Sequence, residues 1–330
     1  MSKNVQTDIR KKFATSFFSI DDIIEERGQL IPTTLSLDIG LKGGLMDGTI
    51  GLVSGGTGSG KTTLLLTIAA NAQKLGKKIY WDDVENRLQP DLLKTIEGLE
   101  TTPDKFEIIK SSKDQFLTAE DNYNIIESLM KNEPNVFVVV DSVAALCDSG
   151  AFSVEHGESK KMMSIQTLSY ACLRKLTQIV RAQKSVLIGI THIQANPSPY
   201  GGGFNEYGGN AWKYFASTRL QCLSSSEYPK DGDKQGRESK FKILKSAIGP
   251  GTGEALFYIK YGQGYYKEKD IFNLAVELGL VEMKGSWIQY NGNKVQGEEN
   301  FIQYLKDNPV ESKSLEATIR TLTGIGEPLK

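Results

Sequence analysis

Residues 55–62 read Gly55-Gly56-Thr57-Gly58-Ser59-Gly60-Lys61-Thr62 and match the pattern G-x-x-x-x-G-K-[ST]. An apolar strand, Ile50–Val53, precedes them, and a helical run, Thr63–Lys74, follows. Glycines let such a loop turn its backbone N–H groups onto phosphates, and the helix behind it points its positive end at them. We therefore predict that Gly55 to Thr63 bind ATP, with Lys61 on the β- and γ-phosphates and Thr62 on Mg²⁺.

A second motif of this kind is an apolar strand that ends in a carboxylate. Val136–Val140 runs directly into Asp141 and Ser142. In phosphate-loop ATPases an aspartate at this point lies beside Mg²⁺, usually through water. An acid that ends a buried strand can instead cap a helix. Because the phosphate loop is present, we predict that Asp141 belongs to the Mg²⁺ site.

Three acids follow one another at the end of a third strand. Ile79–Asp83 leads into Val84 and Glu85, so Asp82, Asp83 and Glu85 all lie near its carboxyl end. Open α/β sheets bind their ligands at the carboxyl ends of the strands. One of these acids is expected to act as the base, or to orient the water, in attack on the γ-phosphate. Spacing alone does not choose among the three.

Short apolar strands alternate with longer helical stretches from about Leu35 onward, which predicts an α/β fold with a mostly parallel sheet and helices on both faces. The predicted strands are Thr49–Ser54, Lys78–Asp83, Phe106–Lys110, Val136–Asp141, Ser185–Thr191, Thr218–Leu223, Lys240–Lys245 and Ala255–Tyr261. After the fifth, Pro197, Pro199 and a run of glycines predict a long loop, and unstructured loops of this length are usually functional.

The chain divides into three predicted parts. Residues 1–30 are expected to form a charged helical arm, in which Ile9, Phe13, Phe17 and Phe18 make an apolar stripe and Asp21 and Asp22 open a second short helix. Residues 31–268 are expected to form the core. Residues 269–330 are expected to form a small α+β domain with a helix at Asp270–Gly279 and a strand at Trp287–Tyr290.

Composition narrows the functional classes. The 330 residues carry a formal net charge of -1, so binding to nucleic acid would have to come from local patches rather than from a global basic field. The three cysteines are widely spaced and form no C-x-x-C pair, which disfavours a zinc site and a disulfide framework. No apolar stretch is long enough to span a bilayer, and the first ten residues lack the apolar segment of a signal peptide. We expect a cytoplasmic protein that does not bind membranes.

Four phrases, taken in order, resemble the RecA family of strand-exchange recombinases from Leu35 to about Leu322. They are Leu37–Leu41 followed by Gly43-Gly44-Leu45, Val140–Leu146, Gly208–Ser217 and Leu305–Pro309. A phosphate loop alone is shared by many unrelated ATPases, whereas this ordered set is specific. The resemblance implies a RecA-like ATPase core, an N-terminal polymerisation arm and a small C-terminal domain.

The resemblance also implies roles for the acids and for a histidine. Asp83-Val84-Glu85 is similar to a D-A-E run in the family, which makes Glu85 the catalytic carboxylate and leaves Asp82 and Asp83 as supporting acids. His192 occupies the position of a glutamine that senses the γ-phosphate, and recombinases of the phage UvsX type carry a histidine there. An isolated strand histidine is otherwise usually structural. Tyr261 begins a run similar to Y-G-E-G, which implies that it packs on adenine.

Two segments match the DNA-binding loops of the family. The first, Phe152–Met163, contains Lys160 and Lys161 and leads toward Arg174, and these charges would neutralise DNA phosphates. The second, Gln194–Asn210, ends in Gly208, Gly209 and Asn210, and its Phe204 and Tyr207 are suited to stacking on bases. The alternative for the two lysines is a solvated helix face. The resemblance implies binding to single-stranded and double-stranded DNA.

The chain departs from the family at several positions. Leu92 stands where RecA has a tyrosine that stacks on adenine, and Thr167 replaces an arginine that contacts DNA. Lys245 matches the first of two lysines that reach a neighbouring subunit's ATP, whereas Ala247 replaces the second. No long acidic tail follows the last domain, and together with His192 this suggests a phage or mobile-element version of the family.

These inferences predict a DNA-dependent ATPase that forms a helical filament of its own copies on single-stranded DNA and catalyses homologous strand exchange in recombination and DNA repair. Single-strand-binding and loader proteins are candidate partners. Two alternatives stay open. One is a hexameric helicase with a RecA fold, which the Gly208–Ser217 phrase disfavours. The other is a recombination mediator that binds ATP without turnover, which the presence of Glu85 and Asp141 disfavours.

Overall fold

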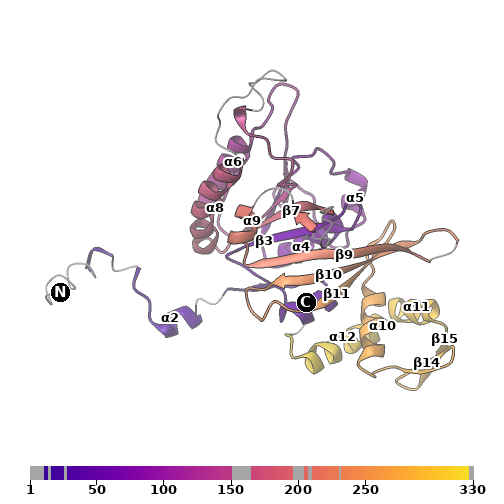
Figure 1. Ribbon diagram of the computed structural model, residues 1–330. Coiled ribbons are helices and arrows are strands. Elements are labelled where there is room, and N and C mark those ends of the chain that lie inside the picture. Colours follow the sequence, from indigo (N-terminus) through magenta and orange to yellow (C-terminus); the bar gives the residue numbers. More distant parts are fainter. Residues whose placement is uncertain are drawn as a thin grey trace, which may run out of the picture.

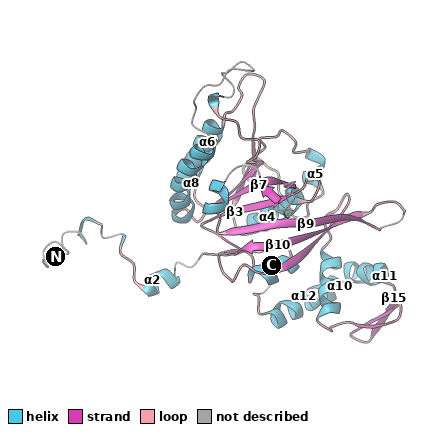
Figure 2. Ribbon diagram, viewed as in Figure 1, coloured by secondary structure: helices cyan, strands magenta, loops and turns pink. Residues whose placement is uncertain are grey.

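A computed structural model describes residues 11–13, 16–25, 28–150, 165–195, 204–206, 210–229 and 232–326. Its centre is a ten-stranded sheet of order β12-β11-β10-β9-β3-β7-β6-β4-β5, with β8 paired to β7 (Figures 1 and 2). The strands are β3 (Thr49–Gly55), β4 (Lys78–Asp82), β5 (Phe106–Ile109), β6 (Val136–Asp141), β7 (Val186–Ala195), β8 (Phe204–Glu206), β9 (Thr218–Tyr228), β10 (Gly236–Lys245), β11 (Glu254–Lys260) and β12 (Gly264–Tyr265).

The pairing of neighbouring strands changes from parallel to antiparallel at β9. From β5 across to β9 all neighbours are parallel, whereas β9, β10, β11 and β12 pair antiparallel. The parallel strands are rich in β-branched residues, as in the Val136–Val140 run of β6, because they are covered on both sides. The predicted α/β class with a mostly parallel sheet is confirmed.

Helices cover the two faces of the parallel region. On one face lies α4 (Lys61–Lys74), whose leucines and alanines pack against Val53, Ile79 and Trp81. On the other face lie α6 (Ala119–Asn132), α8 (Ile165–Ala182) and α9 (Asn210–Phe215), which enclose Ile50, Leu52 and Tyr80. The strands therefore alternate their side chains between two cores. A short helix, α5 (Pro90–Lys94), follows β4.

The segment predicted as a loop after β7 is partly a hairpin. β7 continues beyond the predicted end at Thr191 to Ala195, and Ile193–Ala195 pair antiparallel with Phe204–Glu206 of β8. The prediction of a loop over all of Gln194–Asn210 was therefore wrong for these residues. Hairpin pairing of two strands across a proline- and glycine-rich segment is a tertiary preference that local composition does not encode.

The last part of the chain packs on the antiparallel side of the sheet. It consists of α10 (Lys267–Glu277), β13 (Glu282–Lys284), β14 (Trp287–Tyr290), β15 (Asn293–Gln296), α11 (Glu298–Asp307) and α12 (Pro309–Thr323), with the three strands in one small antiparallel sheet. Its buried residues form one cluster with Leu35 and Tyr258 of the larger unit. The apolar core is thus continuous between the two parts.

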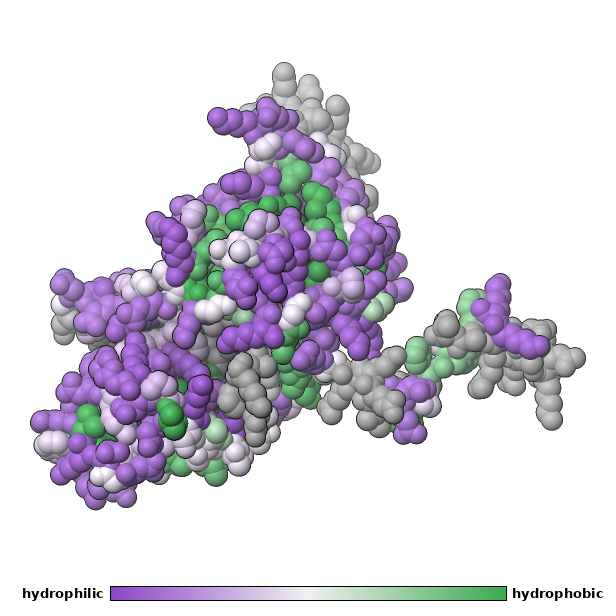
Figure 3. Space-filling view, turned by 180° about the vertical axis from the view of Figure 1, so that it is seen from behind, coloured by the Kyte–Doolittle hydropathy of each residue, from purple (hydrophilic) through white to green (hydrophobic). Residues whose placement is uncertain are grey.

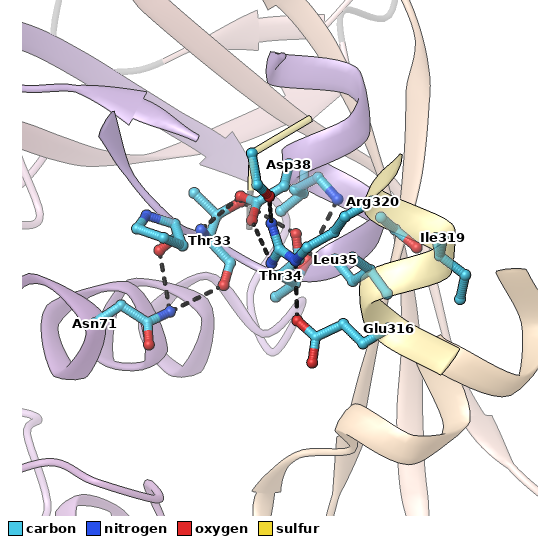
Figure 4. A network of polar contacts seen from close by, with 12 residues as sticks. Thr33, Thr34, Leu35, Asp38, Asn71, Glu316, Ile319 and Arg320 are labelled. Carbon is cyan, nitrogen blue, oxygen red and sulfur yellow. Dashed lines mark hydrogen bonds and ion pairs between the residues drawn. The ribbon is translucent and has the colours of Figure 1, made fainter. Parts of the chain in front are cut away.

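A buried ion-pair network joins α12 to α3 (Leu35–Leu41) (Figure 4). The Arg320 guanidinium donates to Oδ2 of Asp38 at 3.1 Å and to Oε1 of Glu316 at 3.0 Å. Oδ1 of Asp38 accepts from the Thr33 backbone N–H at 2.7 Å. Burial nevertheless raises the pKa of Asp38 to about 6, because the hydrogen bonds and the arginine charge only partly offset the loss of water.

The N-terminal segment stands away from the body of the molecule (Figure 1). It contains α2 (Ile20–Glu25), with Asp21 and Asp22 in its first turn, and leads into a small sheet of β1 (Leu30–Ile31) and β2 (Leu45–Met46). Phe13, Phe17 and Phe18 are about half exposed, and apolar atoms are visible along this arm in Figure 3. Ile9 lies outside the described residues.

Candidate nucleotide-binding and catalytic site

The phosphate loop connects β3 to α4 as the sequence predicts. Gly58 and Gly60 have φ of +69° and +82°, in the left-handed region that favours glycine. A Cβ on Gly55 would lie 2.7 Å from Cβ of Cys222, so the start of the loop also packs too closely for a side chain. The loop therefore needs glycine for conformation and for space.

Lys61 lies at the first residue of α4 with its side chain folded over the loop. Its Nζ donates to the carbonyl oxygens of Gly55 at 2.9 Å and Gly56 at 2.7 Å. Burial lowers the pKa of Lys61, while the carboxylates of Asp141 and Glu85 act in the opposite direction. The ammonium group is thus held at the loop by backbone acceptors and by the acids opposite it.

Thr62, in the first turn of α4, lies within hydrogen-bonding distance of Asp141, the last residue of β6. The Thr62 hydroxyl donates to Oδ2 of Asp141 at 3.1 Å. Burial, with the charges of Glu85 and Asp83, raises the pKa of Asp141 to about 6, although the Thr62 hydrogen bond and Lys61 act in the opposite direction. A hydroxyl and a carboxylate are hard oxygen ligands that suit Mg²⁺, and a cation would relieve the repulsion among these acids. These two residues fit the predicted magnesium site.

Glu85 lines the same cavity as the phosphate loop and Asp141, and its carboxylate has a defined orientation. Its Oε1 accepts a short hydrogen bond from Ser142 and lies 3.1 Å from Nε2 of His192, and its Oε2 lies 2.8 Å from a guanidinium nitrogen of Arg87. Burial acts to raise its pKa, but the hydrogen bonds from Ser142 and His192 and the Arg87 charge outweigh it and hold the pKa of Glu85 below its usual value. The group is therefore an anion near neutral pH.

The other two acids of the run have different environments. Asp83 accepts the backbone N–H groups of Arg87 at 2.9 Å and Leu88 at 3.0 Å, so it organises the turn that follows Glu85. Asp82 is fully buried, on the opposite side of β4 from Trp81. Of the three, Glu85 is the one that lines the nucleotide cavity.

This cavity, of about 500 Å³, extends from the phosphate loop to the far end of β11. Its lining includes Thr57 to Thr63, Glu85, Asp141 and His192 at one end and Leu92, Tyr261, Gly262 and Arg237 toward the other. Tyr261 donates to Oε1 of Glu227 at 2.7 Å, and Arg237 donates to the same oxygen at 3.3 Å. The predicted phosphate and base residues therefore line one continuous space.

Comparison with known proteins agrees with this geometry. Residues 3–266 match the family model of the RecA N-terminal domain, and residues 269–324 match that of the RecA C-terminal domain. The chain is 33% identical to "Protein RecA" of Laribacter hongkongensis over 92% of its own length and 84% of that protein. It is 35% identical to "Protein RecA" of Geobacter sulfurreducens over 89% of its own length and 86% of that protein. It is 34% identical to "Protein RecA" of Legionella pneumophila over 87% of its own length and 81% of that protein. The chain belongs to the RecA family.

Lys245, predicted to reach the ATP of a neighbouring subunit, does not line the nucleotide cavity of its own chain. β10 runs antiparallel to β9, so Lys245 pairs with Arg219, which is level with Leu52 before the end of β3. Its Nζ donates to the Ala216 carbonyl at 2.6 Å. The start of β10, which carries Arg237, lies at the nucleotide cavity instead.

The predicted DNA-binding residues of this RecA-family chain are described only in part. Lys160, Lys161, Gly208 and Gly209 lie outside the described residues, as do Tyr207 and the first loop, 152–163. Arg174 is exposed on α8, and Asn210 is exposed at the start of α9. These helices pack together through aromatic rings, with Tyr170 6.2 Å from Tyr214 between centroids.

Sequence reasoning missed Arg237, Arg87 and Ser142. Arg237 lies three residues before the predicted start of its strand, because β10 begins at Gly236 rather than at Lys240. Arg87 contacts Glu85 from two residues away on the same loop, whereas Ser142 contacts it from the loop after β6, which only the tertiary structure brings close. In the described part of the chain, no helix has both the length and the apolar character needed to cross a membrane.

Proposed function

We propose that this RecA-type recombinase is a DNA-dependent ATPase that assembles as a helical filament on single-stranded DNA and pairs it with homologous double-stranded DNA. The observation that carries the proposal is the contact of Glu85 with His192, at 3.1 Å, within the cavity that contains the phosphate loop. It links a candidate catalytic carboxylate to β7, which leads into the segment matched to the second DNA-binding loop.

The proposed chemistry is attack of water on the γ-phosphate. Glu85, held as an anion by Ser142 and Arg87, accepts a proton from the water or orients it. Lys61 contacts the phosphates, and Thr62 and Asp141 hold Mg²⁺. Bound Mg²⁺ supplies neutralisation of the charge on the phosphate oxygens.

Self-assembly is supported by the position of Lys245, which does not line the nucleotide cavity of its own chain. In the proposed filament, this lysine approaches the γ-phosphate bound to the next protomer and stabilises the charge that develops there. The exposed phenylalanines of the N-terminal arm are the proposed contact with a neighbouring copy. We further propose a cytoplasmic location, with single-strand-binding and loader proteins as partners.

Electron microscopy of the protein with ATP and single-stranded DNA tests the assembly, and an ATPase assay with and without DNA tests the coupling. We expect continuous helical filaments and hydrolysis stimulated by DNA. Closed rings would favour the alternative of a hexameric helicase. Tight ATP binding without turnover would favour a recombination mediator.

A further inference from the structure

A second cavity, of about 660 Å³, lies next to the segment that carries Glu85. Glu85 lines the nucleotide cavity, whereas its two neighbours in sequence, Val84 and Asn86, line the second one. The other walls come from the residues after β5, from Asn122 on α6 and from the residues after β6. The cavity therefore opens at the carboxyl ends of parallel strands, where α/β sheets bind ligands.

Two buried oxygen-bearing side chains line this cavity without a partner. Asp82 has no exposed surface, and neither of its carboxylate oxygens has a hydrogen-bond partner among the described residues. Asn122 is 3% exposed, and its Oδ1 is also unpartnered there. Buried polar atoms are nearly always hydrogen-bonded, so this pair requires an explanation.

The charges around Asp82 add to the need for a partner that would stabilise its carboxylate. Burial, together with the neighbouring charge of Asp83, raises the pKa of Asp82 to about 7. Lys110 and Lys113 line the same cavity, but neither is among the influences on Asp82. A buried carboxylate without a compensating cation is strongly unfavourable, and such groups are ordinarily paired or bound to a metal.

We propose that Asp82 and Asn122 form a second cation site, separate from the magnesium site of Thr62 and Asp141, and that it takes a hydrated divalent cation. The donors are three hard oxygens, which suit Mg²⁺ or Ca²⁺. The described residues contain no group of three or more His, Cys, Asp or Glu that could hold a metal ion, so water would have to supply most of the ligands at this site. The cavity has room for the waters that Mg²⁺ keeps when one or two carboxylates bind it.

Occupancy of this site is linked to the position of Glu85. The oxygens of Asp82 and Asn122 are covered in the structure, so an ion reaches them only when part of the cavity wall moves. Val84 and Asn86 belong to that wall and flank Glu85. Ion binding and the orientation of Glu85 therefore influence each other, since linkage between two sites is reciprocal. This link rests on the proposed function, whereas ion binding itself does not.

The test measures binding of Mn²⁺, as the probe, by electron paramagnetic resonance on the full chain without nucleotide or DNA. The background variant Asp141→Asn removes the carboxylate of the nucleotide site. We expect one bound Mn²⁺ per chain in this background and at least about tenfold weaker binding when Asp82→Asn is added. Competition with Mg²⁺, Ca²⁺ and K⁺ separates a divalent from a monovalent site.

Two further variants keep the test decisive if Asp82→Asn folds poorly. Asn122→Asp adds a charge and is expected to tighten Mn²⁺ binding, whereas Asn122→Leu is expected to weaken it. Asp114→Asn is the matched control, because Asp114 is an exposed acid on the loop that walls the same cavity. The proposal is overturned if the Asp141→Asn chain binds no Mn²⁺, or if its affinity does not respond to either residue.

Discussion

Nε2 of His192 lies 3.1 Å from Oε1 of Glu85, so β7 contacts the proposed catalytic carboxylate directly. The Nδ1 atom of the same ring is buried without a hydrogen-bond partner in the described part of the chain. Glu85 thus holds the ring from one side only. A change in Glu85 on nucleotide binding would move the ring and, with it, the strand that pairs with β8.

His192→Ala is expected to leave ATP affinity largely unchanged and to remove the dependence of DNA affinity on the nucleotide, because the link from Glu85 to β7 is lost. The measurement is DNA affinity with ATP and with ADP. His192→Gln, which restores the residue type matched in the family, is the control and should keep the dependence. A difference of wild-type size in the alanine variant would refute the sensor role.

Glu85→Gln and Lys61→Ala are expected to separate hydrolysis from binding. Glu85→Gln should still bind ATP and assemble on DNA, while turnover falls by at least about 100-fold, the usual contribution of a general base. Lys61→Ala should lose ATP-dependent assembly, because Lys61 contacts the phosphates. ATPase rates and filament images provide the measurements. Near-normal turnover in Glu85→Gln would reassign the role of catalytic carboxylate to Asp83 or Asp82.

Lys245→Ala is expected to abolish DNA-stimulated hydrolysis without weakening ATP binding to isolated protomers, because the phosphate loop is complete within one chain. Mixing it with Glu85→Gln should restore part of the activity, since some interfaces then combine an intact Glu85 with an intact Lys245. Lys242→Ala, an exposed lysine on the same strand, is the matched control. Absence of recovery in mixtures shown to co-assemble would argue against a shared site.

Arg237→Ala is expected to weaken ATP and ADP binding by about tenfold, a loss of roughly 1.4 kcal/mol. Arg237 lines the nucleotide cavity beside Tyr261 and is held by Ser225 at 3.0 Å and Glu227 at 3.3 Å. Leu92 in the same cavity cannot supply an aromatic face. Lys240→Ala, on the same strand but paired with Glu254, is the control. If Arg237→Ala binds ATP and ADP with the same affinities as the unchanged protein, Arg237 does not contribute to nucleotide binding.

Arg320→Met is expected to lower the free energy of unfolding by about 3–5 kcal/mol, because it leaves the carboxylate of Asp38 buried without its cation, although Glu316 keeps its ion pair with Lys267. Chemical denaturation of the variant measures this loss. Lys313→Met, at an exposed position on the same helix, should change stability little. If the denaturation curves of Arg320→Met and Lys313→Met match, the ion-pair network contributes little to stability.

The fold class and the phosphate end of the site could be predicted because their signals are local. The glycine loop, the β-branched run before Asp141 and the alternation of strands and helices are each contained within about twenty residues. The choice of Glu85 over Asp82 was not available from spacing, because it depends on the turn after β4, which places Glu85 in the nucleotide cavity while Asp82, the last residue of β4, lines the other cavity. The pairing of Arg320 with Asp38 joins residues 282 positions apart, beyond any local pattern.

The start of β10, at the end of the cavity predicted to hold the adenine base, also could not be predicted from local sequence. Arg237 lies among polar residues that do not read as a strand, and it pairs with Glu227 on β9 and Ile259 on β11 only in the folded sheet. Likewise, the extension of β7 past His192 depends on β8, which lies beyond the prolines. Register between distant strands is a property of the assembled sheet.

The antiparallel course of β10 has a consequence for any assembly built on Lys245. In such an assembly each protomer would offer its nucleotide cavity to one neighbour and Lys245, which does not line that cavity, to the other, so copies would join head to tail and the polymer would have two unlike ends. At one end the last cavity has no neighbour to complete it, and ATP bound there should persist longer than ATP in the interior. Growth and loss of subunits should then proceed at different rates at the two ends, which single-filament imaging with each end marked would reveal.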